Sequence, residues 1–199
     1  MPFPERLAIA TKNAHKLREL GRICHDWPVE WLTVENHPGP WPDVPEPHET
    51  YLDNALEKAR AIASALGEPA IADDSGIEAD ALDGGPGSRS ARFAGEGASD
   101  AENLAKLVEA IGDEQPDART ARYRCVAAIA WPDGRALHAE GVCDGTLVTT
   151  PRGAGGFGYD PIFVSEGEQR TMAELQDEEK DRISHRGRAF RALARHLSA

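Results

Sequence analysis

The sequence contains few cysteines, few lysines and no long apolar run. Its 199 residues include three cysteines, Cys24, Cys125 and Cys143, which are far apart and odd in number. That usage argues against a disulfide framework or a zinc site and fits buried thiols in a reducing compartment. No apolar run is long enough to span a bilayer, and residues 1–5 lack the basic start and apolar core of a signal peptide. We therefore expect a cytoplasmic protein without a membrane partner.

The charge balance is acidic, with a formal net charge of -12. A nucleic-acid backbone is bound by clustered basic charge, so no nucleic-acid partner is expected. Lysine supplies only five of the 22 basic residues. The segments singled out below contain Lys12, Lys16, Lys58 and Lys180. Because arginine is the default cation of this chain, these lysines hint at places where a compact ammonium charge is required.

Two adjacent carboxylates follow a short apolar segment at residues 70–72, which reads as the end of a buried strand. Side chains alternate along a strand, so Asp73 and Asp74 should point in different directions, one into a site and one toward the turn. Gly76 would leave room for a ligand to come close. Carboxylate oxygens suit Mg²⁺, which favours phosphate co-ligands. The alternative is an ordinary acidic turn.

A second polar turn follows a short apolar strand at residues 6–10. Leu17, Leu20 and Cys24 then recur at helical spacing, which predicts a helix that begins near Asn13. A strand, a polar turn and a helix N-terminus can bind an anion, and Lys16 could reach back over it. The segment lacks the glycines of the P-loop signature, and an ordinary capped helix is the alternative.

A strand at residues 29–34, a proline-rich irregular loop at 36–48 and a helix from Thr50 to Gly67 are expected next. Glu46 and Glu49 are possible second carboxylates for a cation. Lys58 lies one helical turn from Asn54, so the two share a face. With the strand before the acidic pair, this order predicts a β-α-β unit with parallel strands.

The second half of the chain is expected to start with a strand at 77–82 and a glycine-rich loop at 83–88, after which Arg92 could contact an anion. Ser99 and Glu102 form a capping box for the next helix. A hairpin of residues 119–131 and 135–148 suggests no chemistry.

Residues 153–158 contain four glycines around Phe157. An aromatic ring flanked by glycines suits stacking on a nucleobase, although it could equally lie in the core. Thr171 and Glu174 form a capping box for a short acidic helix that ends near Lys180, and Ser184 caps the last helix.

Six segments together resemble the inosine triphosphate pyrophosphatase (XTP/dITP diphosphatase) family, in the family's order and over nearly the whole chain. They are Thr11-Lys12-Asn13-Ala14-His15-Lys16; Thr50-Tyr51 with Asn54-Ala55 and Lys58-Ala59; Asp73-Asp74-Ser75-Gly76; Gly84-Gly85-Pro86-Gly87 with Ser90-Ala91-Arg92-Phe93; Gly156-Phe157-Gly158-Tyr159-Asp160-Pro161; and Lys180 with Ile183-Ser184-His185-Arg186-Gly187. The resemblance implies one pyrophosphatase domain over residues 1–199, with a two-lobed α/β fold. It also implies a long mixed central β-sheet flanked by helices, a cleft between the lobes, a homodimer and Mg²⁺.

The resemblance also implies roles for individual residues. Asp74 would accept a proton from the attacking water, Ser75 would contact substrate, and Asp74 with Glu46 would hold the metal. The implied phosphate-binding residues are Thr11, Lys12, Asn13, Ala14, His15, Lys16 and Lys58. The implied base-binding residues are Phe157, Gly158, Tyr159, Asp160, Lys180, His185 and Arg186.

Two departures from the family pattern affect the phosphate and metal segments. The family usually has glycine where this chain has Lys12. The usual Glu-Thr-Gly before the second helix is Glu46-Pro47-His48 here, so Glu46 is the second metal carboxylate by position, with Glu49 possible.

The implied activity is Mg²⁺-dependent hydrolysis of deaminated purine nucleoside triphosphates (ITP, dITP and XTP) to the monophosphate and pyrophosphate. Lys180 and Arg186 offer only N–H donors, which favour a 6-oxo purine over the 6-amino group of adenine. Guanine also has a 6-oxo group, so its rejection needs a further contact at position 2. The alternatives are a non-catalytic nucleotide sensor and a house-cleaning pyrophosphatase for other modified nucleotides.

Overall fold

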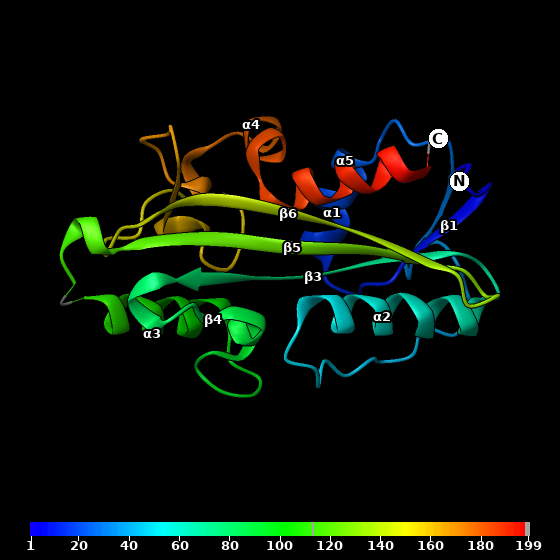
Figure 1. The fold of residues 1–199 in the computed structure, drawn as a ribbon, viewed down its shortest axis with the longest axis horizontal. Coiled ribbons are helices and arrows are strands. Elements are labelled where there is room, and N and C mark those ends of the chain that lie inside the picture. Colours follow the sequence, from blue (N-terminus) through cyan, green and yellow to red (C-terminus); the bar gives the residue numbers. More distant parts are fainter. Residues whose placement is uncertain (113, 198–199) are drawn as a thin grey trace. The chain divides into compact units, whose positions relative to one another are not determined.

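The computed structural model describes residues 1–112 and 114–197 (Figure 1). The chain forms two compact units. Unit 1 contains residues 1–74, residues 125–141 and the chain from Arg186 onward, and unit 2 contains residues 75–124 and 142–185. Three strands contribute residues to both units: β3 (Ala70–Ala79), β5 (Thr120–Ala130) and β6 (Ala136–Leu147).

The described residues also form shorter strands, α-helices and several 3-10 turns. The strands are β1 (Arg6–Ile9), β2 (Glu30–Leu32), β4 (Gly85–Pro86) and β7 (Phe163–Ser165). The α-helices are α1 (Ala14–Ile23), α2 (Tyr51–Leu66), α3 (Asp100–Ile111), α4 (Asp177–Ile183) and α5 (His185–Leu197). The 3-10 turns are Asp80–Leu82, Gly87–Arg92, Pro116–Ala118, Asp160–Ile162 and Met172–Glu174.

The strands form a mixed sheet in the order β2-β1-β3-β5-β6-β7, with β4 paired to β3. Strand β1 pairs in parallel with β2 and with β3, as the β-α-β pattern predicts. Pairs β3–β4 and β6–β7 are antiparallel. The predicted α/β fold with a mixed sheet flanked by helices is confirmed.

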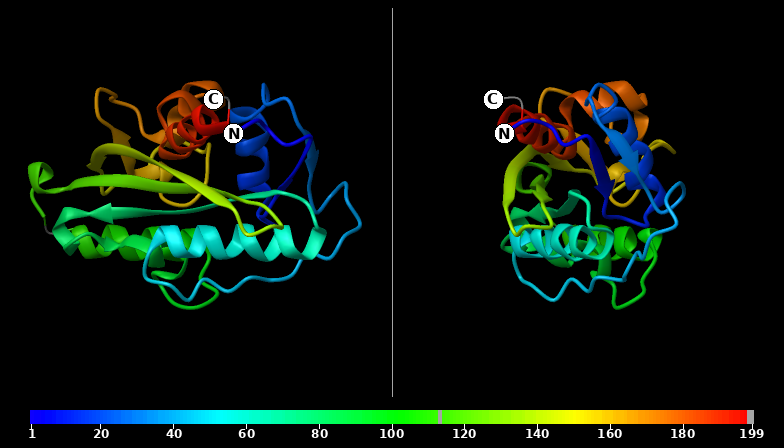
Figure 2. Two further views of the ribbon diagram at one scale, coloured as in Figure 1. Left: turned by 45° about the vertical axis from the view of Figure 1, so that its right-hand side comes forward. Right: turned by 90° about the vertical axis from the view of Figure 1, so that its right-hand side faces the viewer.

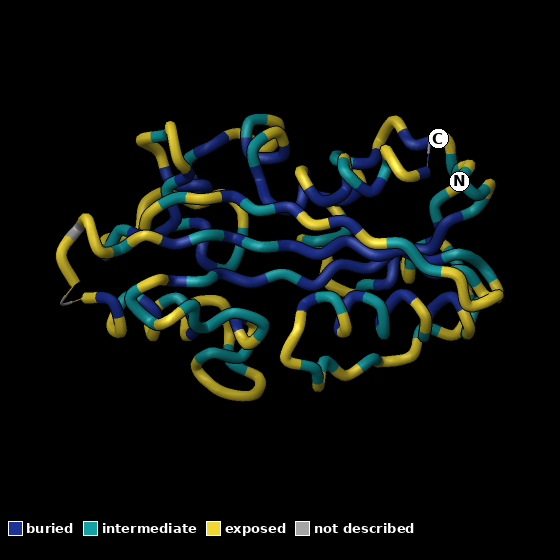
Figure 3. The backbone as a smooth tube through the Cα atoms, viewed as in Figure 1, coloured by how far each residue is buried: buried dark blue, intermediate teal, exposed yellow. Residues whose placement is uncertain are grey.

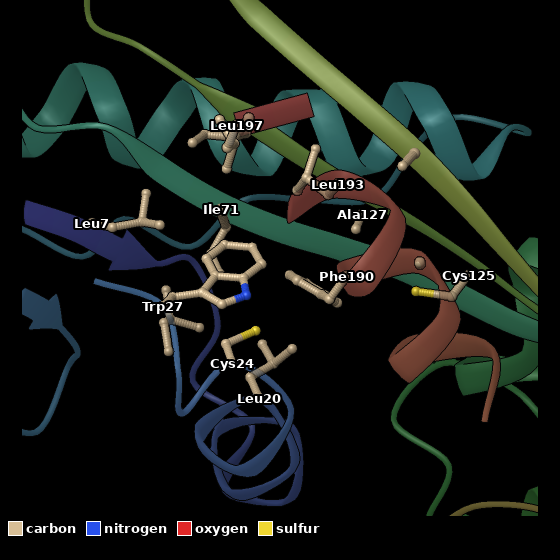
Figure 4. Packing of buried hydrophobic residues seen from close by; sticks show 14 residues of the cluster. Leu7, Leu20, Cys24, Trp27, Ile71, Cys125, Ala127, Phe190, Leu193 and Leu197 are labelled. Atoms are coloured by element: carbon tan, nitrogen blue, oxygen red, sulfur yellow. The ribbon is translucent and has the colours of Figure 1, made fainter. Parts of the chain in front are cut away.

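In unit 1 the alternation of strand side chains builds a core on each face of the sheet. Leu7 and Ile9 of β1 pack with α1 and α5, whereas Ala8 packs with α2. Figure 4 shows the first of these cores, in which the rings of Trp27 and Phe190 lie 6.2 Å apart by their centroids. Helices α1 and α5 therefore cover one face of the unit 1 strands and α2 covers the other (Figures 1 and 2).

The two helices that follow the polar turns of unit 1 begin as the sequence predicts. The Asn13 side chain caps α1, and Thr50 caps α2 by accepting from the Asp53 N–H. Gly67 ends α2 in the left-handed conformation, with φ 70°. The strand predicted at 29–34 is shorter in the structure, where β2 ends at Leu32. The irregular loop predicted at 36–48 therefore covers residues 33–50; it is more exposed than the strands (Figure 3) and runs alongside α2 (Figure 2).

Strand β3 is longer than the sequence predicts, and the predicted strand end and turn at residues 73–76 are wrong. The strand runs unbroken from Ala70 to Ala79, and the predicted separate strand at 77–82 is its second half followed by a 3-10 turn. Gly76 has a negative φ. A Cβ there would lie 2.1 Å from the Gly87 carbonyl oxygen. Within unit 2, then, a segment of the chain itself fills the space that the sequence assigned to a ligand.

Unit 2 has one core, formed by its strands together with α3 and the turns after β6. The Ser99–Glu102 capping box begins α3 as predicted. The single acidic helix predicted after Thr171 is wrong, because it divides into a 3-10 turn and α4. Gln176 and Glu179 form a second capping box at the division. Within residues 1–112 and 114–197, no helix is both long and apolar enough to cross a membrane.

Candidate functional site

Asp73 and Asp74 point to opposite faces of β3, as predicted, and have different partners. Asp73 Oδ2 accepts from Lys16 Nζ at 3.1 Å and from Arg186 Nη2 at 3.0 Å. Asp74 accepts from Lys58 Nζ at 3.2 Å and from Asn54 Nδ2 at 3.1 Å. We call these six residues, with Glu46 and Glu19, the carboxylate–lysine cluster; all of them belong to unit 1.

Arg186 is the most buried cation of this cluster, with 2% of its surface exposed. Its guanidinium donates to Asp73 through two nitrogens and to Glu19 through a third. Burial alone would raise the pKa of Asp73, but the charges of Arg186 and Lys16 outweigh it and hold that pKa well below its usual range. Asp73 is therefore a permanent anion. Arg186, which the resemblance assigns to the base, binds two carboxylates here.

Asp74 has the opposite electrostatic balance. Burial raises its pKa, the charge of Glu46 adds to the increase, and Lys58 only partly offsets them. Lys58 Nζ lies 2.7 Å from Glu46 Oε1 as well as 3.2 Å from Asp74 Oδ1. Two neighbouring carboxyls whose pKa values are pushed apart divide into an anchor and a proton acceptor. The raised pKa makes Asp74 the candidate for the acceptor of this pair.

The carboxylates of Glu46 and Asp74 converge on one ammonium group, so their oxygens could also converge on a metal ion. Burial would raise the pKa of Glu46, but Lys58 lowers it below its ordinary value, so Glu46 stays ionised. Glu49, the other candidate, is exposed. Among the residues that the structure describes, no three His, Cys, Asp or Glu side chains form a metal cage. A hard ion that takes its remaining ligands from phosphate and water fits such a donor set, and Mg²⁺ is that kind of ion.

The polar turn before α1 is organised by its own side chains. Thr11 Oγ1 accepts from the Asn13 N–H at 3.2 Å, and Asn13 Oδ1 accepts from the N–H groups of His15 and Lys16. Ala14 is the first residue of α1. Lys12 does not point into the turn but pairs with Asp43 of the 33–50 loop at 2.6 Å. The N–H groups at the start of this helix therefore already donate to side-chain oxygens. An anion bound here would have to replace those oxygens as the hydrogen-bond acceptor.

Unit 2 brings together a second group, centred on the buried Asp160. Its carboxylate accepts from Lys180 Nζ at 2.6 Å, from the Phe157 N–H at 2.9 Å and from the Tyr123 hydroxyl at 3.2 Å. His185 stacks on the Tyr123 ring, with centroids 4.5 Å apart and planes 9° apart. We call these five residues the Asp160 cluster.

Gly158 and Tyr159, two further predicted base residues, also lie in unit 2. Lys180 Nζ lies 5.2 Å from the centroid of the Phe157 ring. Gly158 donates its N–H to Asp100. The Tyr159 hydroxyl donates to the Ser90 carbonyl at 2.7 Å, and burial raises its pKa above the ordinary value.

Two predicted contact residues lie in other parts of unit 2. Ser75 follows Asp74 in β3 and is half-buried. Arg92 ends a 3-10 turn, where its Nε lies 3.6 Å from Glu96 Oε1.

Sequence reasoning missed Glu19 and Tyr123 and assigned no role to Asn54. Asn54 shares a helix face with Lys58, and that spacing was the one available signal. Its amide accepts from the His48 N–H and donates to the His48 carbonyl and to Asp74, so it fixes the end of the loop against the Asp74 carboxylate. Tyr123 lies in the hairpin for which the sequence suggested no chemistry. The sequence around it has the pattern of an ordinary buried strand, so it gave no signal of a site.

Comparison with known proteins identifies relatives along almost the whole chain. The Ham1 family model matches residues 7–196. The dITP/XTP pyrophosphatase of Geobacter sulfurreducens is 46% identical over 192 residues, which are 96% of either chain. The enzyme of the same name from Streptomyces coelicolor is 50% identical over 190 residues and 94% of either chain.

Solved structures agree with these matches. A HAM1 protein from Coxiella burnetii superposes with a TM-score of 0.86 at 38% identity, over 98% of this chain and 99% of that one. A nucleoside-triphosphatase/dITP/XTP pyrophosphatase from Mycobacterium abscessus gives a TM-score of 0.74 at 41% identity, over 94% of this chain and 97% of that one.

Proposed function

Because this chain belongs to the Ham1 family, we propose that it hydrolyses the deaminated purine nucleotides ITP, dITP and XTP to the monophosphate and pyrophosphate. It is a hydrolase of nucleoside triphosphates, and its role is to remove these nucleotides from the pool before they enter DNA or RNA. The observation that carries the proposal is the sequence similarity to two dITP/XTP pyrophosphatases, which are 46% and 50% identical over nearly the full length of this chain. The electrostatic division of Asp73 and Asp74 supports it.

In the proposed reaction, a water oxygen forms a bond to the α-phosphorus as the bond from that phosphorus to the bridging oxygen breaks. Asp74 takes a proton from the water, and pyrophosphate leaves with the bond electrons. A raised pKa suits a carboxylate for this role, because a general base works best when its pKa lies near the operating pH. Asn54 and Lys58 orient Asp74 through the hydrogen bonds described above.

The charge of the triphosphate is met by cations of unit 1. Lys16, Lys58 and Lys12 are the ammonium groups, and the proposed contacts also include Thr11, Asn13, Ala14 and His15. Glu46 and Asp74 would hold Mg²⁺, which when bound supplies positive charge to the phosphates and the attacking water. Preorganised charge of this kind supplies most of the rate gain in phosphoryl chemistry.

Base selection is assigned to the Asp160 cluster of unit 2. Asp160 holds the Lys180 ammonium group, and both Lys180 and His185 are of the donor type that a 6-oxo group would accept from. An adenine 6-amino group would leave these buried donors unpaired, which is strongly unfavourable. Arg186 has the different role of holding Asp73 and Glu19 in place.

The products and the position of attack test this proposal together. ITP or XTP is hydrolysed with magnesium in water enriched in heavy oxygen, and the products are analysed by mass spectrometry. We expect pyrophosphate as the first product and one heavy oxygen in the monophosphate. Orthophosphate as the first product, or heavy oxygen in the pyrophosphate, would refute attack at the α-phosphorus.

We further propose that the protein acts as a homodimer in the cytoplasm. The three buried free cysteines support a reducing compartment. Sedimentation equilibrium at micromolar concentration should give twice the mass of one chain, and a single-chain mass at that concentration would contradict the dimer.

A further inference from the structure

Tyr123 of β5 makes two different contacts within the Asp160 cluster. It is buried, with 7% of its surface exposed. Its hydroxyl donates to Asp160 Oδ1 at 3.2 Å, and its ring stacks on the His185 ring with centroids 4.5 Å apart. A single side chain in the middle of a strand therefore holds both a carboxylate and an imidazole of this cluster.

The Asp160 carboxylate accepts hydrogen bonds through both of its oxygens. Oδ2 accepts from Lys180 Nζ and from the Phe157 N–H, whereas Oδ1 accepts from the Tyr123 hydroxyl. Gly156 leaves room for Oδ2, since an added Cβ at that position would lie 2.1 Å from this oxygen. The hydroxyl of Tyr123 therefore fixes the rotation of the carboxylate, so that Oδ2 stays directed at the ammonium group of Lys180.

The ring of Tyr123 is itself fixed by the core of unit 2. Its centroid lies 4.7 Å from that of the fully buried Phe163, and the two ring planes are inclined by 57°. The His185 ring is nearly parallel to the Tyr123 ring, with 9° between the planes. Stacking of this kind favours one plane of the imidazole. The orientation of His185 therefore depends on a ring that belongs to the core.

We propose that Tyr123 is a positioning residue for base selection. Through Asp160 it holds the ammonium group of Lys180, and through its ring it holds the imidazole of His185. The inference rests on the proposed function and adds to it the residue that makes the two donors rigid.

Rigid donors improve base selection in two ways. They lose little conformational freedom when a 6-oxo purine binds, so less binding energy is spent on ordering them. They also do not move away from the 6-amino group of adenine, so the penalty for unpaired buried donors stays high. Loss of the support from Tyr123 should therefore weaken binding of the 6-oxo base and relax discrimination against adenine.

Steady-state kinetics with ITP and ATP tests the role of the hydroxyl, because Tyr123→Phe removes it and keeps the ring. We expect this variant to raise KM for ITP and to lower the ITP-to-ATP ratio of kcat/KM by about five- to tenfold, as for a lost hydrogen bond to a charged group. The kcat for ITP should stay within about twofold of wild type, since the residues assigned to the chemistry belong to unit 1. Tyr123→Leu, which also removes the ring, should lower the ratio further.

Two controls separate positioning from a general loss of packing. Ile111→Val shortens a fully buried side chain in the same core, so it should lower stability without changing the ITP-to-ATP ratio. In a Lys180→Met background, Tyr123→Phe should have little further effect on the ratio, because the ammonium group that the hydroxyl positions is already absent.

An equal fall of the ratio in Ile111→Val and Tyr123→Phe would overturn the inference. A full effect of Tyr123→Phe in the Lys180→Met background would refute the route through Asp160, and equal ratios in Tyr123→Phe and Tyr123→Leu would refute the role of the ring. In the wild-type protein, absent turnover of ITP or equal turnover of ATP would refute the proposed function. Wild-type selectivity for ITP together with an unchanged ratio in Tyr123→Phe would refute only the role of Tyr123.

Discussion

Asp73 and Asp74 are neighbours in the chain, yet their surroundings shift their pKa values in opposite directions. Asp73 faces Arg186 and Lys16 and stays charged, whereas Asp74 lies beside Glu46 and Lys58 and has a raised pKa. Substitution of each carboxylate by its amide should therefore have different consequences for activity and for stability.

Asp74→Asn should lower kcat on the order of 100-fold or more, because it removes the general base. The fold should persist, since burial already disfavours the charge of Asp74. Steady-state kinetics with ITP measures the effect, with Glu49→Gln as the control for loss of an exposed carboxylate. Activity of Asp74→Asn within a few-fold of wild type would show that Asp74 is not the proton acceptor.

Asp73→Asn should destabilise the fold by about 3 kcal/mol, because it leaves the buried Arg186 with one fewer anionic partner. The folded-state pKa of Asp73 is lowered, so its contribution to the free energy of unfolding is fully present above the unfolded-state pKa of about 4 and declines as the pH falls from there toward the folded-state pKa. Urea unfolding should therefore show that wild type and variant differ most in free energy of unfolding near neutral pH. The difference should become smaller in acid. A gap that does not change with pH would contradict the ion-pair account.

Glu46 and Glu49 can be distinguished by their magnesium requirement. Glu46→Gln should raise the magnesium concentration for half-maximal activity by about tenfold or more, since a carboxylate ligand is lost. Glu49→Gln should leave it unchanged, because that side chain is exposed and lies outside the carboxylate–lysine cluster. The comparison is made by measuring initial rates at increasing magnesium concentration. A larger magnesium requirement for Glu49→Gln than for Glu46→Gln would assign the metal ligand to Glu49 instead.

At the scale of elements, β3 is the strand that carries Asp73 and Asp74, and its second half depends on a glycine. Gly76→Ala would place a Cβ 2.1 Å from the Gly87 carbonyl oxygen, so the packing of Gly87–Arg92 on β3 must shift. We expect a loss of roughly 2 kcal/mol or more, within the range known for overpacking.

The matched control for that substitution is Gly21→Ala. Gly21 lies on α1 with nothing within 4 Å of an added Cβ, so alanine should stabilise the helix by roughly 0.5–1 kcal/mol. In urea unfolding, Gly76→Ala should lower the free energy of unfolding and Gly21→Ala should raise it. If Gly76→Ala left the free energy of unfolding unchanged, the close approach of the Gly87 backbone would not restrict the residue at position 76.

Local signals in the sequence predict most elements and their caps. Asn13, Thr50 and Ser99 begin their helices because each side-chain oxygen accepts from a helical N–H two or three residues on. The length of β3 could not be predicted, because Asp-Asp-Ser-Gly is turn chemistry and tertiary packing of Gly87 against Gly76 overrides it. The division of the acidic helix was missed because Gln176 is a less familiar cap than serine or threonine.

The candidate site was predictable where chemistry and spacing coincide and not where contacts are long-range. Strand alternation alone sends Asp73 and Asp74 to opposite faces. By contrast, 113 residues separate Arg186 from Asp73, and 37 separate Tyr123 from Asp160. No periodic pattern signals such pairs, so the carboxylate partners of Arg186 and the role of Tyr123 emerge only from the fold.

At the scale of the whole molecule, the activity combines two groups of residues with separate tasks. In the proposed function, the carboxylate–lysine cluster of unit 1 is assigned the phosphate chemistry, and the Asp160 cluster of unit 2 is assigned base selection. Both assignments predict one measurable property of the intact protein, which is a preference for 6-oxo deaminated purines in a reaction that releases pyrophosphate.

The most direct test is a comparison of kcat/KM for ITP, dITP, XTP, GTP and ATP with magnesium and pyrophosphate detection. We predict that ITP, dITP and XTP are hydrolysed with kcat/KM values on the order of 100-fold or more above that of ATP, because adenine leaves buried donors unpaired. We also predict a lower value for GTP. Turnover of ATP comparable to that of ITP and XTP would contradict the central claim.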